Sequence, residues 1–271
     1  MTCNYSDYNN VDLNWKIASN NENNIQGTYQ NGTYILTIID TVKVTNISTL
    51  NKALPSVKIN GNGTLKVNDQ DSSFNALTIE NAKFDISNKR LNVNTLTLKG
   101  KDASLITNSI SMKNLVVDEA NYVVNNNLSL ENVDVINKGT LNVNGTVSVT
   151  NLNLDNESTL IVTGTTGDAI SVKNGGKLQL FGTANIKAAE GKTGICCVSE
   201  ESAIYLANSS RVTISGGTFT IGHFASKENA KVYYPKNAIL ENNKITSSEG
   251  NILLLLSYGT ICKVTFEQEN N

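Results

Sequence analysis

The chain has 271 residues, of which 39% are hydrophobic and 17% are charged, a composition typical of a globular protein and not of a disordered one. The formal net charge is −2 and no basic block is present, which argues against nucleic acid or an anionic membrane surface as the partner, because both need clustered lysine and arginine. The longest apolar run, Ile252–Leu256, is far shorter than the roughly 20 residues of a membrane-spanning helix.

Residues 1–34 are expected to form an N-terminal cap. They contain the single tryptophan, Trp15, in the stretch VDLNWKIAS (11–19), which we interpret as covering the first coil of the repeat described next. The opening stretch MTCNYSDYNN is polar and lacks the apolar segment of a signal peptide. Because the architecture predicted below occurs mostly outside cells, we expect an extracellular or cell-surface protein from which a signal peptide has been removed.

A repeat of about 19 residues occupies much of residues 35–222. Six units begin at Lys52, Ser72, Leu91, Ile110, Leu128 and Val147. The sixth and eighth positions of every unit are aliphatic: Val57 and Ile59, Leu77 and Ile79, Leu96 and Leu98, Leu115 and Val117, Val133 and Val135, Leu152 and Leu154. The third positions are also apolar: Leu54, Phe74, Val93, Met112, Leu130 and Val149. This period of two predicts strands with one buried face.

Each unit contains three such short strands, joined by corners of a few residues. The pattern predicts a coil of parallel strands in which each strand stacks on its equivalent about 4.8 Å away. One coil alone buries almost nothing, so the core forms only when coils are stacked. After Val147 the coils lengthen, because Ile170 and Ile195 are the next two starts. The predicted fold class is therefore all-β, a β-solenoid with about 19–25 residues per coil.

The corners are rich in asparagine, which makes up about one residue in six of the chain. Asparagine tolerates positive φ and can hydrogen-bond to its equivalent in the next coil, so we predict asparagine ladders with a structural role. The fifth positions hold Asn114, Asn132, Asn151 and Asn174, and the seventeenth positions hold Asn68, Asn88, Asn126 and Asn144.

Three later segments carry a resemblance to a known architecture. They are GDAISV (167–172), KLQLFGTANI (177–186) and RVTISGGTFTI (211–221). These segments resemble rungs of the right-handed parallel β-helices of bacterial surface proteins and of the pectin-lyase-like superfamily. The resemblance covers residues 35–222 and implies a right-handed parallel β-helix with capped ends. A leucine-rich-repeat horseshoe is the alternative, but it usually has a helix or extended turn where this chain has the strands TLNVN and TLIVT.

Residues 223–271 lose the repeat. We expect residues 223–271 to form C-terminal cap strands, with NILLLLSYGTICKVTF (251–266) as one or two buried strands, or KVTFEQENN to begin a following module. The four cysteines, Cys3, Cys196, Cys197 and Cys262, lack the paired spacing of a zinc site. Their spacing does not decide whether any of them form disulfides. We expect no metal and no cofactor.

The resemblance suggests a polysaccharide lyase or glycoside hydrolase as one function. Hydrolysis requires two carboxylates across a groove, and the lyases of this fold usually combine an aspartate cluster for calcium with a basic residue. This chain has only two arginines, Arg90 and Arg211, and one histidine, His223. The predicted outward column of the second strand reads Lys58, Thr78, Thr97, Val116, Asp134 and Asn153. This column is not acidic, so we expect no catalytic residues, and its break at Val116 argues against an ice-binding threonine face.

The preferred function is a rigid structural or adhesive module that binds a glycan or a protein on a host or neighbouring cell. Insertions in solenoids commonly line a binding face, so ligand contacts are expected at the longer corners 187–194 and 199–203. The candidate contact residues are Lys192, Glu200, Glu201 and the neighbouring Tyr205, whose ring offers a stacking surface. A phage-fibre segment is a further alternative, which predicts a trimer with an apolar outward column.

Overall fold

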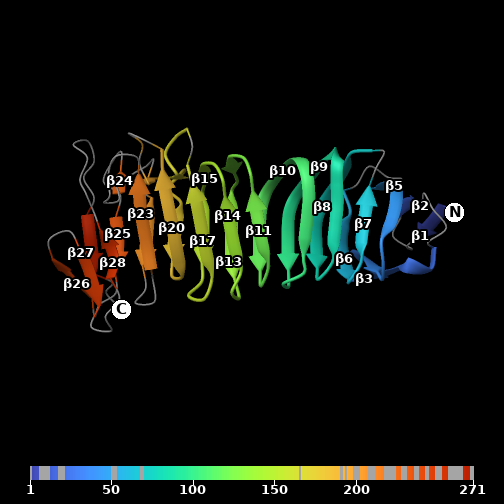
Figure 1. Ribbon diagram of the computed structural model, residues 1–271, viewed down its shortest axis with the longest axis horizontal. Helices are drawn as coiled ribbons and strands as arrows, with labels where there is room; N and C mark the ends of the chain where they lie inside the picture. The colour runs from blue at the N-terminus through green and yellow to red at the C-terminus, as the bar shows by residue number, and fades with distance from the viewer. Residues whose placement is uncertain are drawn as a thin grey trace. The chain divides into compact units, whose positions relative to one another are not determined.

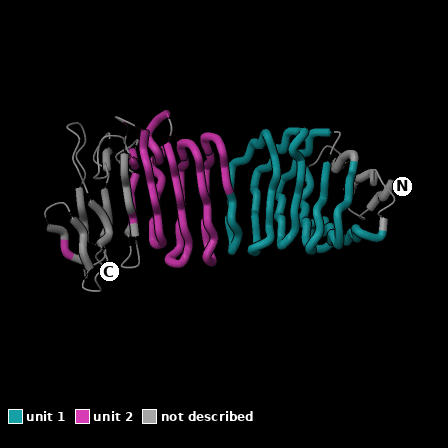
Figure 2. The backbone as a smooth tube through the Cα atoms, in the orientation of Figure 1, with its two compact units in different colours: residues 1–122 teal, residues 123–271 magenta. Residues whose placement is uncertain are grey.

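The computed structural model describes residues 2–5, 13–17, 22–49, 54–67, 70–164, 166–189, 192, 194–197, 202–206, 211–216, 224–226, 231–234, 238–241, 244–247, 252–255 and 265–268. Regular structure in these ranges consists of strands and one 3₁₀ turn, η1 (Glu22–Asn24) (Figure 1). Among the described residues, no helix has the length and hydrophobicity needed to cross a lipid bilayer. The chain divides into two compact units, Met1–Tyr122 and Val123–Asn271 (Figure 2).

Unit 1 is built from long parallel strands that bend around corners. Its strands are β1 (Thr2–Tyr5), β2 (Leu13–Ile17), β3 (Ile25–Gln30), β4 (Thr33–Ile38), β5 (Val42–Thr49), β6 (Ser56–Gly61), β7 (Thr64–Val67), β8 (Ser72–Glu80), β9 (Lys83–Lys99) and β10 (Ser104–Asp118). The pairs β4–β6, β6–β8, β8–β9, β5–β7, β7–β9 and β9–β10 are all parallel.

Several corners of unit 1 lie inside continuous strands. The sequence predicts three short separate strands per coil, yet β9 has 17 residues and β10 has 15. The two strands stay paired from Lys83 with Ser104 to Lys99 with Asp118, with one register shift. Corner residues therefore keep backbone hydrogen bonds to the next coil, and the strand bends without ending.

The N-terminal strands of unit 1 pair differently from the coils. Strand β1 pairs antiparallel with β2, and β2 pairs antiparallel with β5, where Trp15 lies opposite Ile47. Strands β3 and β4 form an antiparallel hairpin whose turn, Asn31–Gly32, has positive φ at both residues. Asparagine followed by glycine suits this turn because both tolerate the left-handed conformation.

Unit 2 separates the coil into three parallel sheets, as the sequence predicts. One sheet contains β13 (Asn132–Ile136), β16 (Asn151–Leu154), β19 (Lys177–Leu180), β22 (Ala203–Leu206), β25 (Lys231–Tyr234) and β29 (Thr265–Gln268). The second contains β11 (Asn121–Val124), β14 (Thr140–Val143), β17 (Thr159–Thr163), β20 (Thr183–Ala188) and β23 (Arg211–Gly216) (Figure 1). The third contains β12 (Leu128–Ser129), β15 (Val147–Val149), β18 (Ile170–Val172), β21 (Ile195–Cys197) and β24 (Phe224–Ser226).

Parallel pairing continues beyond residue 222, through β24, β25 and β29. Strands β26 (Ala238–Glu241), β27 (Lys244–Ser247) and β28 (Ile252–Leu255) form a small antiparallel sheet. The segment 251–266 therefore contributes β28 to the antiparallel sheet and the start of β29 to the parallel one.

The core confirms the predicted β-solenoid. The described strands make about seven turns. All twelve aliphatic residues at the sixth and eighth repeat positions are buried: Val57, Ile59, Leu77, Ile79, Leu96, Leu98, Leu115, Val117, Val133, Val135, Leu152 and Leu154. In unit 2 the same rows continue through Leu178 and Leu180, which pair with Leu152 and Leu154.

The third repeat position is less regular than its apolar composition suggests. Phe74, Val93 and Val149 are buried. Leu54 is 49% exposed, and Met112 and Leu130 are only half-buried. The expectation that Leu130 points fully into the core is therefore wrong. This position lies beside a corner, and two of its residues, Leu54 and Leu130, lie outside the strands, where a side chain has fewer neighbours.

Asparagine ladders are present, as the composition predicts. Asn151 Nδ2 donates to Asn132 Oδ1 at 2.9 Å, and Asn144 Nδ2 donates to Asn125 Oδ1 at 3.0 Å. Two of the predicted positions are wrong, because Asn144 bonds to Asn125 in place of Asn126, and Asn174 does not continue the ladder. Asn174 instead occupies a turn with a φ of 54°. The longer coil after Val147 inserts that turn before the strand that aligns with Asn151.

Candidate functional site

A polar face of unit 2 combines aligned side chains from four neighbouring strands, and we name it the amide face. It comprises Asn132 and Asp134 on β13, Asn151 and Asn153 on β16, Lys177 and Gln179 on β19, and Tyr205 on β22. These residues alternate along the strands with the buried Val133, Val135, Leu152, Leu154, Leu178 and Leu180, so they point away from the core. None of the seven is buried.

The strand register brings four of these residues into one row. Asp134 pairs with Asn153, Asn153 with Gln179, and Gln179 with Tyr205. The same register pairs Tyr205 with Tyr233 on β25. Strands in a sheet lie about 4.8 Å apart, so the row presents one polar or aromatic side chain at each such interval.

Hydrogen bonds along the stack hold the amides of this face in place. Asn151 Nδ2 donates to Asn132 Oδ1 at 2.9 Å, and Asn151 Oδ1 accepts the backbone N–H of Lys177 at 3.1 Å. In the adjacent row, Asn153 Nδ2 donates to Asp134 Oδ1 at 3.3 Å. The amides of Asn132, Asn151 and Asn153 therefore have a fixed orientation, which lowers the entropy that a ligand must remove on binding.

A surface depression of about 350 Å³ lies over this part of the face. It is lined by Asn132, Val133, Asp134, Asn151, Leu152, Asn153, Lys177 and Gln179. Each asparagine or glutamine side chain carries two N–H donors and a carbonyl acceptor, and a carboxylate accepts up to about four hydrogen bonds. Such a surface can pair with a ligand whose hydroxyl groups both donate and accept.

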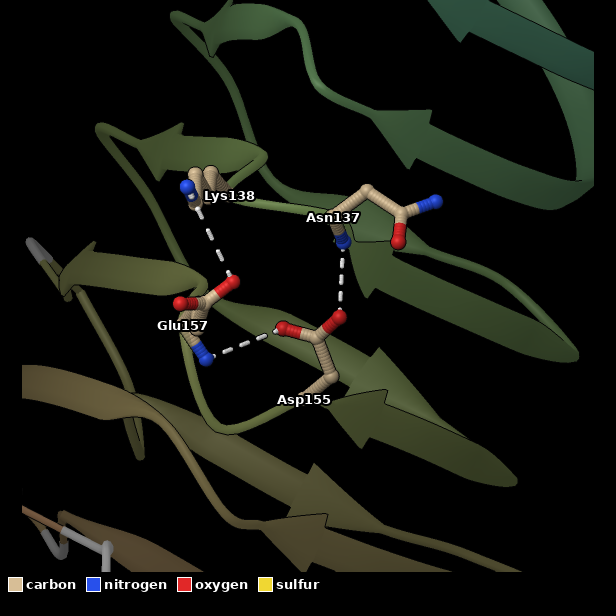
Figure 3. Close-up of polar contacts among 4 residues, drawn as sticks. All are labelled: Asn137, Lys138, Asp155 and Glu157. Atoms are coloured by element: carbon tan, nitrogen blue, oxygen red, sulfur yellow. Dashed lines mark hydrogen bonds and ion pairs between the residues drawn. The ribbon is translucent and has the colours of Figure 1, made fainter.

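A second carboxylate near this sheet has a structural role. Asp155, at the corner after β16, accepts the backbone N–H of Asn137 at 2.6 Å and that of Glu157 at 3.2 Å (Figure 3). Asn137 and Lys138 both have positive φ, so this carboxylate stabilises a strained turn in the preceding coil. At the same corner, Lys138 Nζ lies 3.9 Å from Glu157 Oε2.

Of the four predicted ligand-contact residues, two lie within the described residues. Tyr205 is half-buried and continues the outward row through its pairing with Gln179. Lys192 is exposed at a corner, where its backbone N–H donates to the carbonyl of Ala189, and it does not line the depression. Glu200, Glu201 and His223 lie outside the described residues.

Sequence reasoning missed Gln179 and Lys177 because the coil that contains them is longer than its predecessors. A fixed repeat length misaligned this coil, although the alternation in KLQL contains the signal. A row of threonines on the second sheet of unit 2 was also not predicted from the sequence. Thr140 pairs with Thr159, and Thr159 with Thr183, whereas the next residue in the row is Arg211.

The cysteines add little to the site. Cys196 is buried on β21, in the row that contains Ser148 and Ser171. Its neighbour Cys197 pairs with Val172 in the strand register. The described residues contain no group of three or more histidine, cysteine or acidic side chains that could hold a metal ion.

Unit 1 presents a different outward surface, in which charges are paired. Lys58 and Lys99 both form ion pairs with Glu80, the latter at 3.2 Å. These contacts hold the pKa of Glu80 below its ordinary value, chiefly through the hydrogen bond from Lys58, although partial burial opposes the shift. Lys66 also forms an ion pair, in which its Nζ atom lies 3.5 Å from Asp85 Oδ2.

No family model, curated protein or solved structure matches this chain.

Proposed function

We propose that this chain is a non-catalytic, extracellular or cell-surface β-helix that acts as a rigid adhesive module and binds a glycan on its amide face. The observation that carries the proposal is the row of Asp134, Asn153, Gln179 and Tyr205 on four consecutive strands. A relationship to the pectin-lyase-like superfamily is part of this proposal and rests on architecture alone.

The chemistry of the face favours a saccharide over an apolar ligand. Sugar hydroxyl groups donate and accept hydrogen bonds, and the face offers both donors and acceptors from its amides and from Asp134. The ring of Tyr205 provides a flat apolar surface on which the C–H face of a pyranose can pack. An extended oligosaccharide could therefore lie across the strands and make a similar contact in each coil.

The carboxylates support a binding role over hydrolysis. Glycoside hydrolysis uses two carboxyl groups on either side of the scissile bond. The described lining of the depression contains one carboxylate, Asp134, and the nearby Asp155 is hydrogen-bonded to two backbone N–H groups of its corner. The proposal therefore assigns recognition, not bond cleavage, to this face.

A glycan array, followed by a product assay, tests the proposal. The full chain should bind a subset of neutral or weakly acidic glycans, and every bound polysaccharide should remain intact on long incubation. Reducing-end and unsaturated-product measurements both detect cleavage. Release of shorter chains by the protein would contradict the non-catalytic function and favour a polysaccharide lyase or hydrolase. Absence of binding across the array would contradict the assignment of a glycan ligand.

A further inference from the structure

One corner of unit 1 changes length between successive coils. Strands β9 and β10 pair in register up to Ile86 with Thr107, and again from Arg90 with Ser109. Between these points β9 has three residues, Ser87, Asn88 and Lys89, whereas β10 has only Asn108. The β9 corner therefore protrudes past the β10 corner, as the longer strand does at a β-bulge.

A surface pocket of about 440 Å³ lies at this step. Its lining residues are Asp71, Ser87, Asn88, Lys89, Arg90, Asn108 and Ser109. Its volume is in the range of small-molecule sites, which is about 300–1,000 Å³. All seven residues are polar or charged, so the pocket suits a hydrophilic ligand.

Local hydrogen bonds hold both sides of the pocket. Asp71 Oδ1 accepts the backbone N–H of Arg90 at 2.9 Å, which ties the protruding corner to the coil before it. On the shorter corner, Thr107 Oγ1 accepts the backbone N–H of Ser109 at 3.3 Å, and its hydroxyl donates to the Ser109 carbonyl at 3.0 Å. These hydrogen bonds fix the backbone on both sides of the pocket.

The cations of this pocket differ from those on the sheets of unit 1. Lys58, Lys66 and Lys99 are each paired with a carboxylate. Within the part of the chain that the structure describes, neither Lys89 nor Arg90 forms an ion pair. The described lining thus carries two positive charges, on Lys89 and Arg90, and one negative charge, on Asp71, an excess that suits one anionic group.

We infer that this corner pocket binds the anionic group, a carboxylate or a sulfate, of an acidic saccharide. The guanidinium of Arg90 can pair with two oxygens of such a group, and Lys89 supplies a second positive charge. Ser87, Asn108 and Ser109 then offer hydroxyl and amide groups to the sugar ring. The pocket belongs to unit 1 and the amide face to unit 2. A failure of the proposed function would therefore leave this inference unaffected, and the reverse also holds.

NMR titration of the full chain tests the inference. The probes are glucuronate and glucose 6-sulfate, with methyl glucoside as the neutral match. At least one acidic sugar should bind with a Kd on the order of 1 mM, and methyl glucoside should bind at least about tenfold more weakly. Arg90→Gln and Lys89→Gln should each weaken binding by roughly tenfold or abolish it. Lys101→Gln removes an exposed charge of the same unit outside the pocket and should leave the Kd unchanged.

Three results would overturn the inference. The acidic sugars could bind no better than methyl glucoside, or Arg90→Gln could bind them as the unaltered chain does. Alternatively, acetate and inorganic sulfate could bind as tightly as the sugars, in which case the pocket attracts small anions without recognising a saccharide. Arg90 is exposed, and the variant keeps the backbone N–H that bonds to Asp71, so it should fold normally, as circular dichroism can verify.

Discussion

Asn151 and Asn132 are linked side chain to side chain across one coil of unit 2, with Asn151 Nδ2 2.9 Å from Asn132 Oδ1. Asn151 also accepts the backbone N–H of Lys177 in the following coil. One amide thus connects three successive coils and fixes the surface on which we place the ligand. The same residue contributes to stability and to the geometry of the amide face.

Replacing Asn151 with alanine should lower the free energy of unfolding by about 0.5–1.5 kcal/mol, because two hydrogen bonds are lost at an exposed site. Asn156→Ala is the matched control, since Asn156 is an exposed turn residue outside this ladder. Urea unfolding monitored by circular dichroism measures both. An equal effect of the two substitutions would show that the ladder does not stabilise the stack.

Val135 and Asp134 are adjacent residues with opposite environments. Val135 is buried against Leu154, whereas Asp134 is on the outward face. Val135→Asp places an unpaired charge in the core and should cost more than about 3 kcal/mol or prevent folding. Asp134→Ala removes one long, part-buried hydrogen bond from Asn153 and should cost less than about 1 kcal/mol. Thermal unfolding compares them, and similar losses for both would contradict the assigned faces of β13.

Asp155 should stabilise the corner shown in Figure 3. Asp155→Ala leaves the N–H groups of Asn137 and Glu157 without their carboxylate acceptor, and should cost about 1–3 kcal/mol. Glu157→Gln is the control at the same corner, because its pairing with Lys138 at 3.9 Å is largely exposed and should contribute almost nothing. Chemical denaturation measures both variants. A larger effect of Glu157→Gln would indicate that the ion pair, and not the N–H contacts, stabilises the corner.

The ion pairs of Glu80 should make stability depend on pH. Because the pKa of Glu80 is lowered in the folded state, its contribution is present above the ordinary value of 4.5 and is lost as pH falls through the folded-state pKa. Glu80→Gln should therefore reduce the free energy of unfolding at pH 7 by about 0.2–1 kcal/mol, and the difference should vanish in acid. The exposed Glu119→Gln serves as a reference. A loss that is independent of pH would rule out the ion pairs as its cause.

The fold could be predicted from the sequence because the core depends on two positions per coil. Residues such as Val57 and Leu98 alternate with polar neighbours, and burial of the sixth and eighth positions in every unit follows from that alternation. The exposure of Leu54 could not be predicted, since an apolar residue beside a corner is buried only if the corner is covered.

The candidate sites were harder to predict because both depend on changes in coil length. Gln179 joins the row of Asn153 only after an insertion that contains the Asn174–Gly175 turn. The step at Lys89 and Asn108 requires a comparison of two corners in three dimensions. A periodic alignment detects what is repeated, whereas both sites occur where the repeat departs from its period.

The affinity of amide-face variants for the glycan selected on the array tests the central claim most directly. Gln179→Ala and Tyr205→Ala should each raise the Kd at least about tenfold, because each removes a contact that the proposal assigns to the row. Asn185→Ala is the control, an exposed amide on β20 in a different sheet, and its Kd should equal that of the unaltered chain. Unchanged affinity in both Gln179→Ala and Tyr205→Ala, measured by isothermal titration calorimetry, would contradict glycan binding on this face.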